Sequence, residues 1–174
     1  MWSSRSRVPR LAAWRSGVAL LTLALLAGCG FQLRGQANYP FQTIYASATG
    51  GPSFTSELRR ALAASGSATV ADEPTKAQVI LDIVLVANDK AVLSLSSGGR
   101  AREFALSKRV QFALRDKEGN EWMPPAEIVI LRTFTYDDSE RLAREIQEQR
   151  LDREMQTDAI QQIVRRLQTA RKPA

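Results

Sequence analysis

The sequence predicts an α+β domain in which a four-stranded mixed β-sheet carries two α-helices packed on one face. Two features of the residue pattern predict this class. Some segments are rich in β-branched residues or have apolar residues at alternate positions, which is typical of strands. Two other segments have apolar residues three and four positions apart, which is typical of helices. These segments follow one another in the order β, α, β, β, β, α. With 174 residues, 44% of them hydrophobic and 24% charged, the chain is long enough for one ordinary domain.

The first half of the predicted domain is a strand followed by a short helix. Residues Gln42–Ala48 predict the strand. A helix should follow, because Ser53 is a suitable N-cap and Gly66 can end it. The apolar residues of this helix fall on one face: Phe54, Leu58, Ala61 and Leu62.

A second strand is predicted at Ala77–Ala87, a segment rich in β-branched residues. Its apolar character indicates that it is well buried. The strand can continue through residues 91–96 after a bend at Asn88–Asp89. Residues 97–100 then predict a tight connection to the next strand.

The clearest strand is Phe104–Leu114, where apolar and polar residues alternate, which predicts one buried and one solvated face. Lys108 interrupts the apolar face, either as a satisfied or snorkelling lysine near the sheet margin or as a functional one. A hairpin turn is expected at residues 116–120. The last strand is Ile128–Tyr136, because Pro124–Pro125 limits any strand that begins earlier.

A long helix is predicted from Ser139, which can cap it, to about Thr169. Its first half carries few apolar residues among many charges, so residues 144–153 can be a solvated helix face. Alternatively, this half projects, kinks or lies against something else. The second half should pack on the sheet through its regularly spaced apolar residues: Leu151, Met155, Ala159, Ile160, Ile163, Val164 and Leu167.

The first residues have the pattern of a secretory signal. Residues 1–15 are basic and polar, and residues 16–27 form an apolar run that would span about 18 Å as a helix, short of the ~30 Å hydrocarbon core of a bilayer. The small residues before Cys29, the only cysteine, resemble a bacterial lipobox. We therefore expect a diacylglycerol-modified Cys29, the alternative being a secreted protein with a free thiol. The predicted division of the chain is as follows: 1–28 signal peptide, 29–41 lipidated N-terminus and tether, 42–170 single domain, 171–174 tail.

Composition excludes several classes of function. The chain carries 24 Lys and Arg against 18 Asp and Glu, but four of the arginines lie in residues 1–28, so 20 cations face 18 acids in the remainder. This balance gives no reason to expect a nucleic-acid partner. The chain has no histidine, which excludes Cys/His zinc sites and Ser-His-Asp or Cys-His catalysis. Asp137 and Asp138 are a conceivable hydrolytic pair, but adjacent acids at a helix start are typical capping groups. We expect no enzyme activity, no catalytic residues, no metal, and no cofactor beyond the lipid on Cys29.

The segment Cys29–Gly35 (CGFQLRG) resembles the lipidated start of the LptE (RlpB) family of lipopolysaccharide-assembly lipoproteins. The similarity returns at Arg132–Asp138 and Leu142–Arg144, and continues through Glu148, Glu154, Met155 and Leu167. The resemblance implies two helices on a four-stranded sheet, seated in the lumen of the outer-membrane β-barrel LptD. The pair would deliver lipopolysaccharide to the outer leaflet, with the lipoprotein acting as plug and barrel-assembly factor.

The resemblance also implies a location and a ligand. Gly30, rather than Asp, follows Cys29, which in lipoproteins with a sorting rule favours the cell outer membrane, here facing the periplasm. The alternative is an unrelated periplasmic adaptor lipoprotein for a transporter or the cell wall. Lipopolysaccharide is a phosphorylated amphiphile, so arginines at element ends are candidate contacts. These are Arg100, with Arg102 beside it, and Arg144 at the start of the long helix; their alternative roles are solubility or salt bridges to barrel acids.

Overall fold

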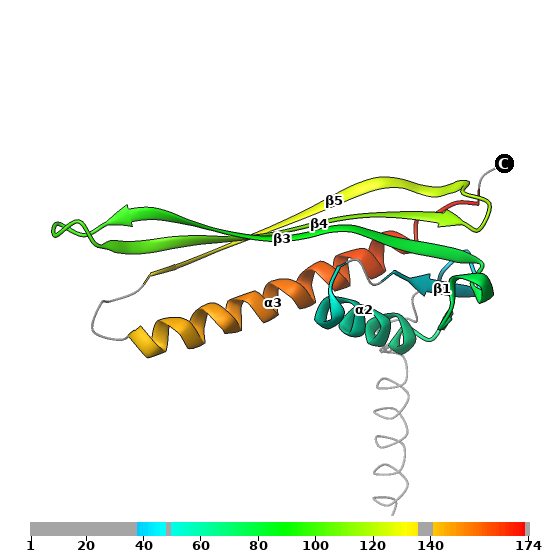
Figure 1. The fold of residues 1–174 in the computed structure, drawn as a ribbon, viewed down its shortest axis with the longest axis horizontal. Helices are drawn as coiled ribbons and strands as arrows, with labels where there is room; N and C mark the ends of the chain where they lie inside the picture. The colour runs from blue at the N-terminus through cyan, green and yellow to red at the C-terminus, as the bar shows by residue number, and fades with distance from the viewer. Residues whose placement is uncertain (1–37, 48–49, 136–140, 173–174) are drawn as a thin grey trace, which may run out of the picture. The chain divides into compact units, whose positions relative to one another are not determined.

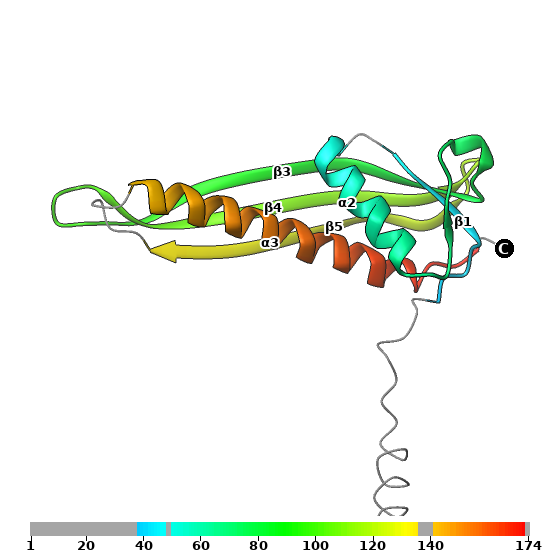
Figure 2. The same cartoon turned by 90° about the horizontal axis from the view of Figure 1, so that it is seen from below.

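Five strands form one mixed sheet in the computed structural model, in the spatial order β2-β1-β3-β4-β5. The structure describes residues 38–47, 50–135 and 141–172, which all belong to one compact unit, Gln36–Ala174. Both helices lie on the same face of the sheet (Figures 1 and 2), so the predicted class is confirmed. The elements are β1 (Thr43–Ala46), α2 (Pro52–Ala64), β2 (Thr69–Val70), a 3-10 turn (Pro74–Lys76), β3 (Val79–Leu95), β4 (Ala101–Asp116), β5 (Glu121–Thr135) and α3 (Arg141–Leu167).

The sheet has one strand more than predicted. The additional strand, β2, is two residues long and runs parallel to β1. Backbone bonds hold it, from Thr69 N–H to the Gln42 carbonyl at 2.8 Å and from Ala71 N–H to the Ile44 carbonyl at 2.8 Å. A strand this short has no side-chain alternation, so no pattern in the sequence could indicate it. β1 is also parallel to β3, whereas β3, β4 and β5 pair antiparallel.

The three antiparallel strands are longer than expected. β3 continues to Leu95, with a register shift between Ile83 and Leu85 in place of the predicted bend at Asn88–Asp89. β5 begins at Glu121, so the expectation that Pro124–Pro125 limits the strand is wrong. The two prolines lie where the pairing of β5 with β4 shifts register, on an edge strand. There the missing N–H groups interrupt no continuous ladder.

α2 begins at Pro52, earlier than the predicted cap at Ser53 allows. Gly51, with φ of 88°, is the cap residue and Pro52 occupies the first helical position, so the predicted Ser53 cap is wrong. Proline suits this position because its fixed φ matches the helix and its missing N–H has no partner there. The helix ends at Ala64, close to Gly66, which has φ of 73° and ends the segment as predicted.

The hydrophobic core lies between the helices and the sheet. It includes Tyr39 and Phe41, whose rings stack at 5.0 Å, so these two residues pack with the domain. At the other end, Ala170 is buried and Arg171 N–H donates to the Trp122 carbonyl at 3.1 Å. Among the α3 side chains that the structure describes, those in the core come from the second half, as its periodicity predicts: Met155, Ala159, Ile160, Ile163 and Leu167.

The opposite face of the sheet is covered by none of the described elements (Figure 1). Its residues include Arg109, Gln111 and Glu127 at the centre and Val129 and Leu131 on β5, of which Leu131 is 63% exposed. No helix in the described part of the chain is long and apolar enough to cross a bilayer.

Candidate functional site

Arg100 lies in the tight connection between β3 and β4, as predicted. The connection is closed by Ser96 N–H donating to the Arg100 carbonyl at 2.7 Å and by Gly99 N–H donating to the Ser96 carbonyl at 2.9 Å. Arg100 N–H also donates to the Ser96 hydroxyl at 3.2 Å. Gly99 has φ of 75°, which a residue with a side chain rarely adopts. The backbone therefore holds the exposed Arg100 side chain at the tip of the hairpin.

Arg144 lies in the first turn of α3 and is half-buried. The figures place the start of this helix at the same end of the sheet as the tip of the β3–β4 hairpin (Figures 1 and 2). The fold thus brings the two candidate arginines to one end, although they are 44 positions apart in the sequence. This end of the domain, comprising the hairpin from Val92 to Arg102 and the first half of α3, is called the hairpin end below.

Exposed aliphatic side chains accompany the arginines at the hairpin end. Val92, Leu93 and Leu95 are each more than half exposed, close to Arg100 and Arg102 in the chain. The sequence indicates these residues only as a continuation of a strand, and not as a surface. Cations beside exposed aliphatic groups suit a molecule that carries both phosphates and acyl chains.

Lys90 links β3 to α3, and sequence reasoning missed it. Its ammonium lies 4.7 Å from the ring centre of Phe104 and 5.8 Å from that of Phe134, and it forms an ion pair with Glu148 of α3. The two rings stack at 5.4 Å. A cation over aromatic faces is attracted by their electron-rich centres. This cluster therefore fixes the charged first half of α3 against β3 and β4.

Lys108 projects from the core face of β4 and is buried. Its ammonium lies 3.0 Å from a carboxylate oxygen of Asp152 in α3. Of the two alternatives that the sequence left open, the structure shows a satisfied lysine within the helix–sheet interface. A second ion pair, Arg132 with Asp158 at 2.5 Å, joins β5 to the same helix.

A cleft of about 640 Å³ lies beside these ion pairs, between the first half of α3 and strands β3 and β4. Buried Leu106 and Met155 contribute apolar lining. The other lining residues are polar or charged: Asn88, Asp89, Lys90, Ser107, Glu145, Glu148, Gln149, Asp152 and Arg153.

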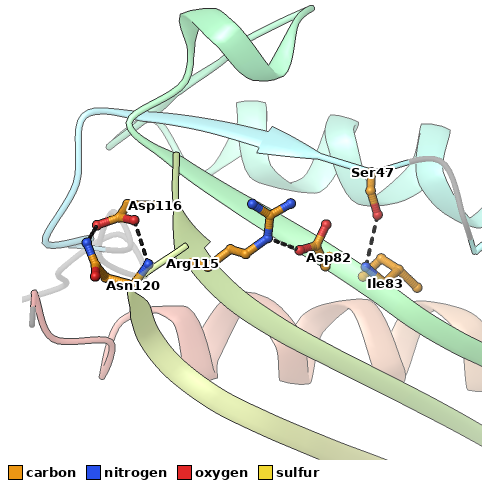
Figure 3. A network of polar contacts seen from close by, with 6 residues as sticks. All are labelled: Ser47, Asp82, Ile83, Arg115, Asp116 and Asn120. Carbon is orange, nitrogen blue, oxygen red and sulfur yellow. Dashed lines mark hydrogen bonds and ion pairs between the residues drawn. The ribbon is translucent and has the colours of Figure 1, made fainter. Parts of the chain in front are cut away.

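At the other end of the sheet, polar contacts fix the strands and their turn (Figure 3). Arg115 of β4 pairs with Asp82 of β3 at 2.6 Å. Asp116 accepts hydrogen bonds from the backbone N–H and side-chain amide of Asn120, at 2.8 and 2.9 Å. The amide bond from Asn120 is the main reason why the pKa of the Asp116 carboxyl lies below its usual value. These contacts are structural and form no reactive group.

Several predicted residues lie outside the part of the chain that the structure describes. They are the lipid-attachment candidate Cys29 and the acid pair Asp137 and Asp138. Among the residues that are described, no cluster of carboxylate, thiolate or imidazole groups could hold a metal ion.

Comparison with known proteins identifies the family to which the chain is similar. The model of the LptE lipopolysaccharide-assembly family matches residues 41–167. The LPS-assembly lipoprotein LptE of Yersinia enterocolitica is 32% identical over 155 residues, covering 85% of this chain and 73% of that protein. The protein of the same name from Pectobacterium atrosepticum is 27% identical, covering 86% and 82%.

Solved structures are similar as well. A lipoprotein B of Nitrosomonas europaea matches with a TM-score of 0.68 and 36% identity, covering 78% of this chain and 88% of that one. The rare lipoprotein B of Shewanella oneidensis has the same fold, with a TM-score of 0.62, 23% identity, and coverage of 74% and 94%.

Proposed function

Because the chain belongs to the LptE lipopolysaccharide-assembly family, we propose that it is the outer-membrane lipoprotein partner of an LptD β-barrel. In this proposal it occupies the barrel lumen, helps the barrel to assemble, and contacts lipopolysaccharide on the way to the outer leaflet. Its role is binding and assembly, without catalysis, metal or cofactor. A lipid on Cys29 anchors it to the membrane, with the domain facing the periplasm.

The observation that carries the proposal is the family match over residues 41–167, which spans nearly all of the described domain. The uncovered sheet face is compatible with a seat inside a barrel. On that face Glu127 accepts a hydrogen bond from Gln111 at 3.1 Å and lies 3.6 Å from Arg109, with exposed aliphatic Val129 and Leu131 nearby. A face that mixes charged and apolar groups suits the polar interior of a large barrel better than a lipid surface.

A pull-down from mild detergent through a carboxyl-terminal tag tests the partner and the anchor. We expect a large barrel whose electrophoretic mobility changes on heating to be recovered with the full-length chain. The Cys29→Ser variant should incorporate no radiolabelled fatty acid, because the thiol that carries the acyl chains is gone. If the chain never co-purifies with a barrel, and instead recovers a transporter or cell-wall fragments, the adaptor alternative replaces this proposal.

The hairpin end supports direct contact with lipopolysaccharide. Arg100 and Arg144 lie at this end, next to exposed aliphatic side chains. Arginine binds phosphate through charge-assisted hydrogen bonds, and aliphatic side chains can contact acyl groups. The test is lipopolysaccharide binding by the Arg100→Glu, Arg144→Glu double variant.

The matched control for that variant is Arg60→Glu with Arg165→Glu, which changes the net charge equally at exposed arginines elsewhere on the helices. We expect the first pair to weaken binding about tenfold or more, and the second pair to weaken it much less. Equal losses in the two variants would mean that only net charge matters. Unchanged affinity in a folded Arg100 and Arg144 variant would remove both residues from the binding site.

A further inference from the structure

The last part of the chain carries basic side chains and no acidic one. Residues 159–174 include four cations, Arg165, Arg166, Arg171 and Lys172, and no Asp or Glu. Two of the four lie in the last turn of α3, where cations interact favourably with the helix dipole. The dipole gives no reason for Arg171 and Lys172, because both follow the end of the helix.

Three of these cations are exposed and keep their charge available. Arg166 is engaged, because its guanidinium donates to the backbone carbonyl of Glu127 at 2.9 Å. Arg165, Arg171 and Lys172 are exposed, and none of them forms an ion pair with another residue in the described part of the chain. These three residues are called the tail cluster below.

The acids nearest to the tail cluster in the fold do not neutralise it. Glu121 and Glu127 of β5 lie opposite Arg115 and Gln111 in the register, so their side chains face the uncovered side of the sheet. Residues 61–71, at the end of α2 and beyond, have no charged side chain.

The turn between β4 and β5 contributes little to this balance. It carries Asp116, Lys117 and Glu118, which together amount to one negative charge. The Asp116 carboxylate is already held by Asn120. The three cations of the tail cluster therefore outweigh the acids of the turn.

The tail cluster lies where the chain enters the domain. Arg171 N–H donates to the Trp122 carbonyl at 3.1 Å, the Trp122 ring meets that of Phe41 edge-on at 6.3 Å, and Phe41 stacks on Tyr39. Ten positions separate Cys29 from Tyr39, and a segment of that length spans at most about 36 Å when fully extended. A lipid on Cys29 would therefore keep this end of the domain close to the bilayer.

The hairpin end lies at the opposite end of the sheet from the carboxyl terminus (Figures 1 and 2). β3 alone has 17 residues, which correspond to about 56 Å at 3.3 Å per residue. This length exceeds the reach of the segment between Cys29 and Tyr39. The tail cluster, rather than the hairpin end, is thus the basic surface that the anchor brings to its own leaflet.

We propose that the tail cluster binds the anionic phospholipid headgroups of the leaflet that holds the Cys29 lipid. The inference rests on the lipid anchor of the proposed function and adds a second attachment, which sets the end of the domain that faces the bilayer. Arginine and lysine pair with phosphates through charge-assisted hydrogen bonds. A basic patch strengthens the attachment of a lipidated protein to an anionic surface, and a short tether raises the effective concentration of that surface.

The shape of this region favours a surface over a small ligand. The hollow beside Arg165 has a volume of about 280 Å³ and is lined only by residues between 162 and 169, so a single stretch of chain forms it. An acidic segment of a partner protein would match the same charges. The position of the tail cluster at the chain entry favours the lipid, because the leaflet lies within reach of the tether whichever partner is present.

The experiment uses Trp122 to sense the distance to the headgroups. Trp2 and Trp14 lie in the predicted signal peptide, so Trp122 is the only tryptophan of the mature chain. The lipidated chain, purified in mild detergent, is added to preformed vesicles of phosphatidylcholine, or of phosphatidylcholine with about a third phosphatidylglycerol. Both contain the same fraction of phosphatidylcholine with a nitroxide on its headgroup, which quenches tryptophan at short range. We expect quenching about twofold or more greater in the anionic vesicles, and a smaller difference as salt is added.

Charge reversal tests the tail cluster. Arg171→Glu with Lys172→Glu keeps the backbone hydrogen bond to Trp122 and should abolish the additional quenching. The matched control, Arg60→Glu with Arg153→Glu, changes the net charge equally at exposed arginines of the two helices and should retain it. Far-ultraviolet circular dichroism checks that both variants are folded.

The inference is overturned if quenching is equal in the two kinds of vesicle, if it survives reversal of the tail cluster, or if the control variant loses it alike. It is also overturned if the chain binds polyglutamate but ignores anionic vesicles, because the occupant is then an acidic protein. A chain that attaches to phosphatidylcholine vesicles without any effect of phosphatidylglycerol removes the tail cluster alone. A chain that attaches to neither kind of vesicle has no anchor, and the anchor of the proposed function fails with it.

Discussion

The buried ion pair between Lys108 and Asp152 predicts an unequal response to removing either partner. The Lys108 side chain is 2% exposed, whereas that of Asp152 is 46% exposed. Replacing Asp152 with Ala leaves a buried ammonium without its counter-ion. Replacing Lys108 with Met fills the same interior with an apolar chain and leaves a carboxylate that water already reaches. The first change should therefore destabilise the protein far more than the second.

The magnitudes follow from the exposure of each group. Removing one partner of a buried ion pair costs about 3–5 kcal/mol, because the remaining charge is left without compensation. Water can enter where the half-exposed Asp152 carboxylate was, and alanine favours a helix by up to about 0.7 kcal/mol. We therefore expect Asp152→Ala to lower the free energy of unfolding by about 2–3 kcal/mol. Lys108→Met, and the double variant, should stay within about 1 kcal/mol of the wild type.

The matched control is Asp158→Ala on the same helix. Asp158 pairs with Arg132, and the two side chains are 43% and 42% exposed, so its loss should cost less than about 1 kcal/mol. Urea unfolding followed by far-ultraviolet circular dichroism measures all four variants. Equal losses for Asp152→Ala and Asp158→Ala, or a loss for Lys108→Met as large as for Asp152→Ala, would refute the argument from burial.

Three further predictions concern individual residues. Burial raises the pKa of the Tyr39 hydroxyl above 10.0, so with rising pH the unfolded chain loses this proton before the folded one does, and stability falls above about pH 10. Tyr39→Phe should therefore reduce the decrease of the unfolding free energy at alkaline pH. The hydrogen bond from Asn120 lowers the pKa of Asp116, so the ionised Asp116 carboxylate contributes to stability above about pH 4, and this contribution is lost as the pH falls through the lowered pKa. Asp116→Asn should remove this dependence of the thermal unfolding temperature on acidic pH. Gly119→Ala should cost about 1 kcal/mol in urea unfolding because φ is 89°. Gly98→Ala should cost much less, because Gly98 has no positive φ and its added Cβ would meet only the Ser96 hydroxyl, at an ordinary contact distance of 3.9 Å.

The sequence predicts the fold best where side-chain patterns are long. Alternation over Phe104–Leu114 identifies β4 and its buried face, and the apolar spacing of the second half of α3 identifies the face that packs on the core. Prediction fails where backbone geometry, rather than a side-chain pattern, determines whether a strand forms or where it begins. The two-residue β2 depends on backbone hydrogen bonds, and Pro124–Pro125 are tolerated because they lie at a register shift on an edge strand.

The candidate site is only partly predictable for a related reason. Arg100 can be placed at a hairpin tip from local turn residues, but its position at the same end as Arg144 depends on how the helix crosses the sheet. The cleft and the cluster around Lys90 are formed by residues from β3, β4 and α3. No local pattern connects residues so far apart in the chain. Lipid attachment at Cys29 remains a prediction from the lipobox and the family.

The first half of α3 shows why hydrophobic periodicity underestimates this domain. That half is charged, and periodicity indicates either a solvated face or a segment that projects, kinks or lies against something else. In the structure, Lys90 with Glu148 and Lys108 with Asp152 join it to the sheet, so oppositely charged pairs perform the docking that apolar residues perform further along the helix. Ion pairs dock the helix without filling the interface with apolar side chains, and the polar cleft beside them remains open. The charges that obscured the helix in the sequence are therefore the same ones that hold it on the sheet.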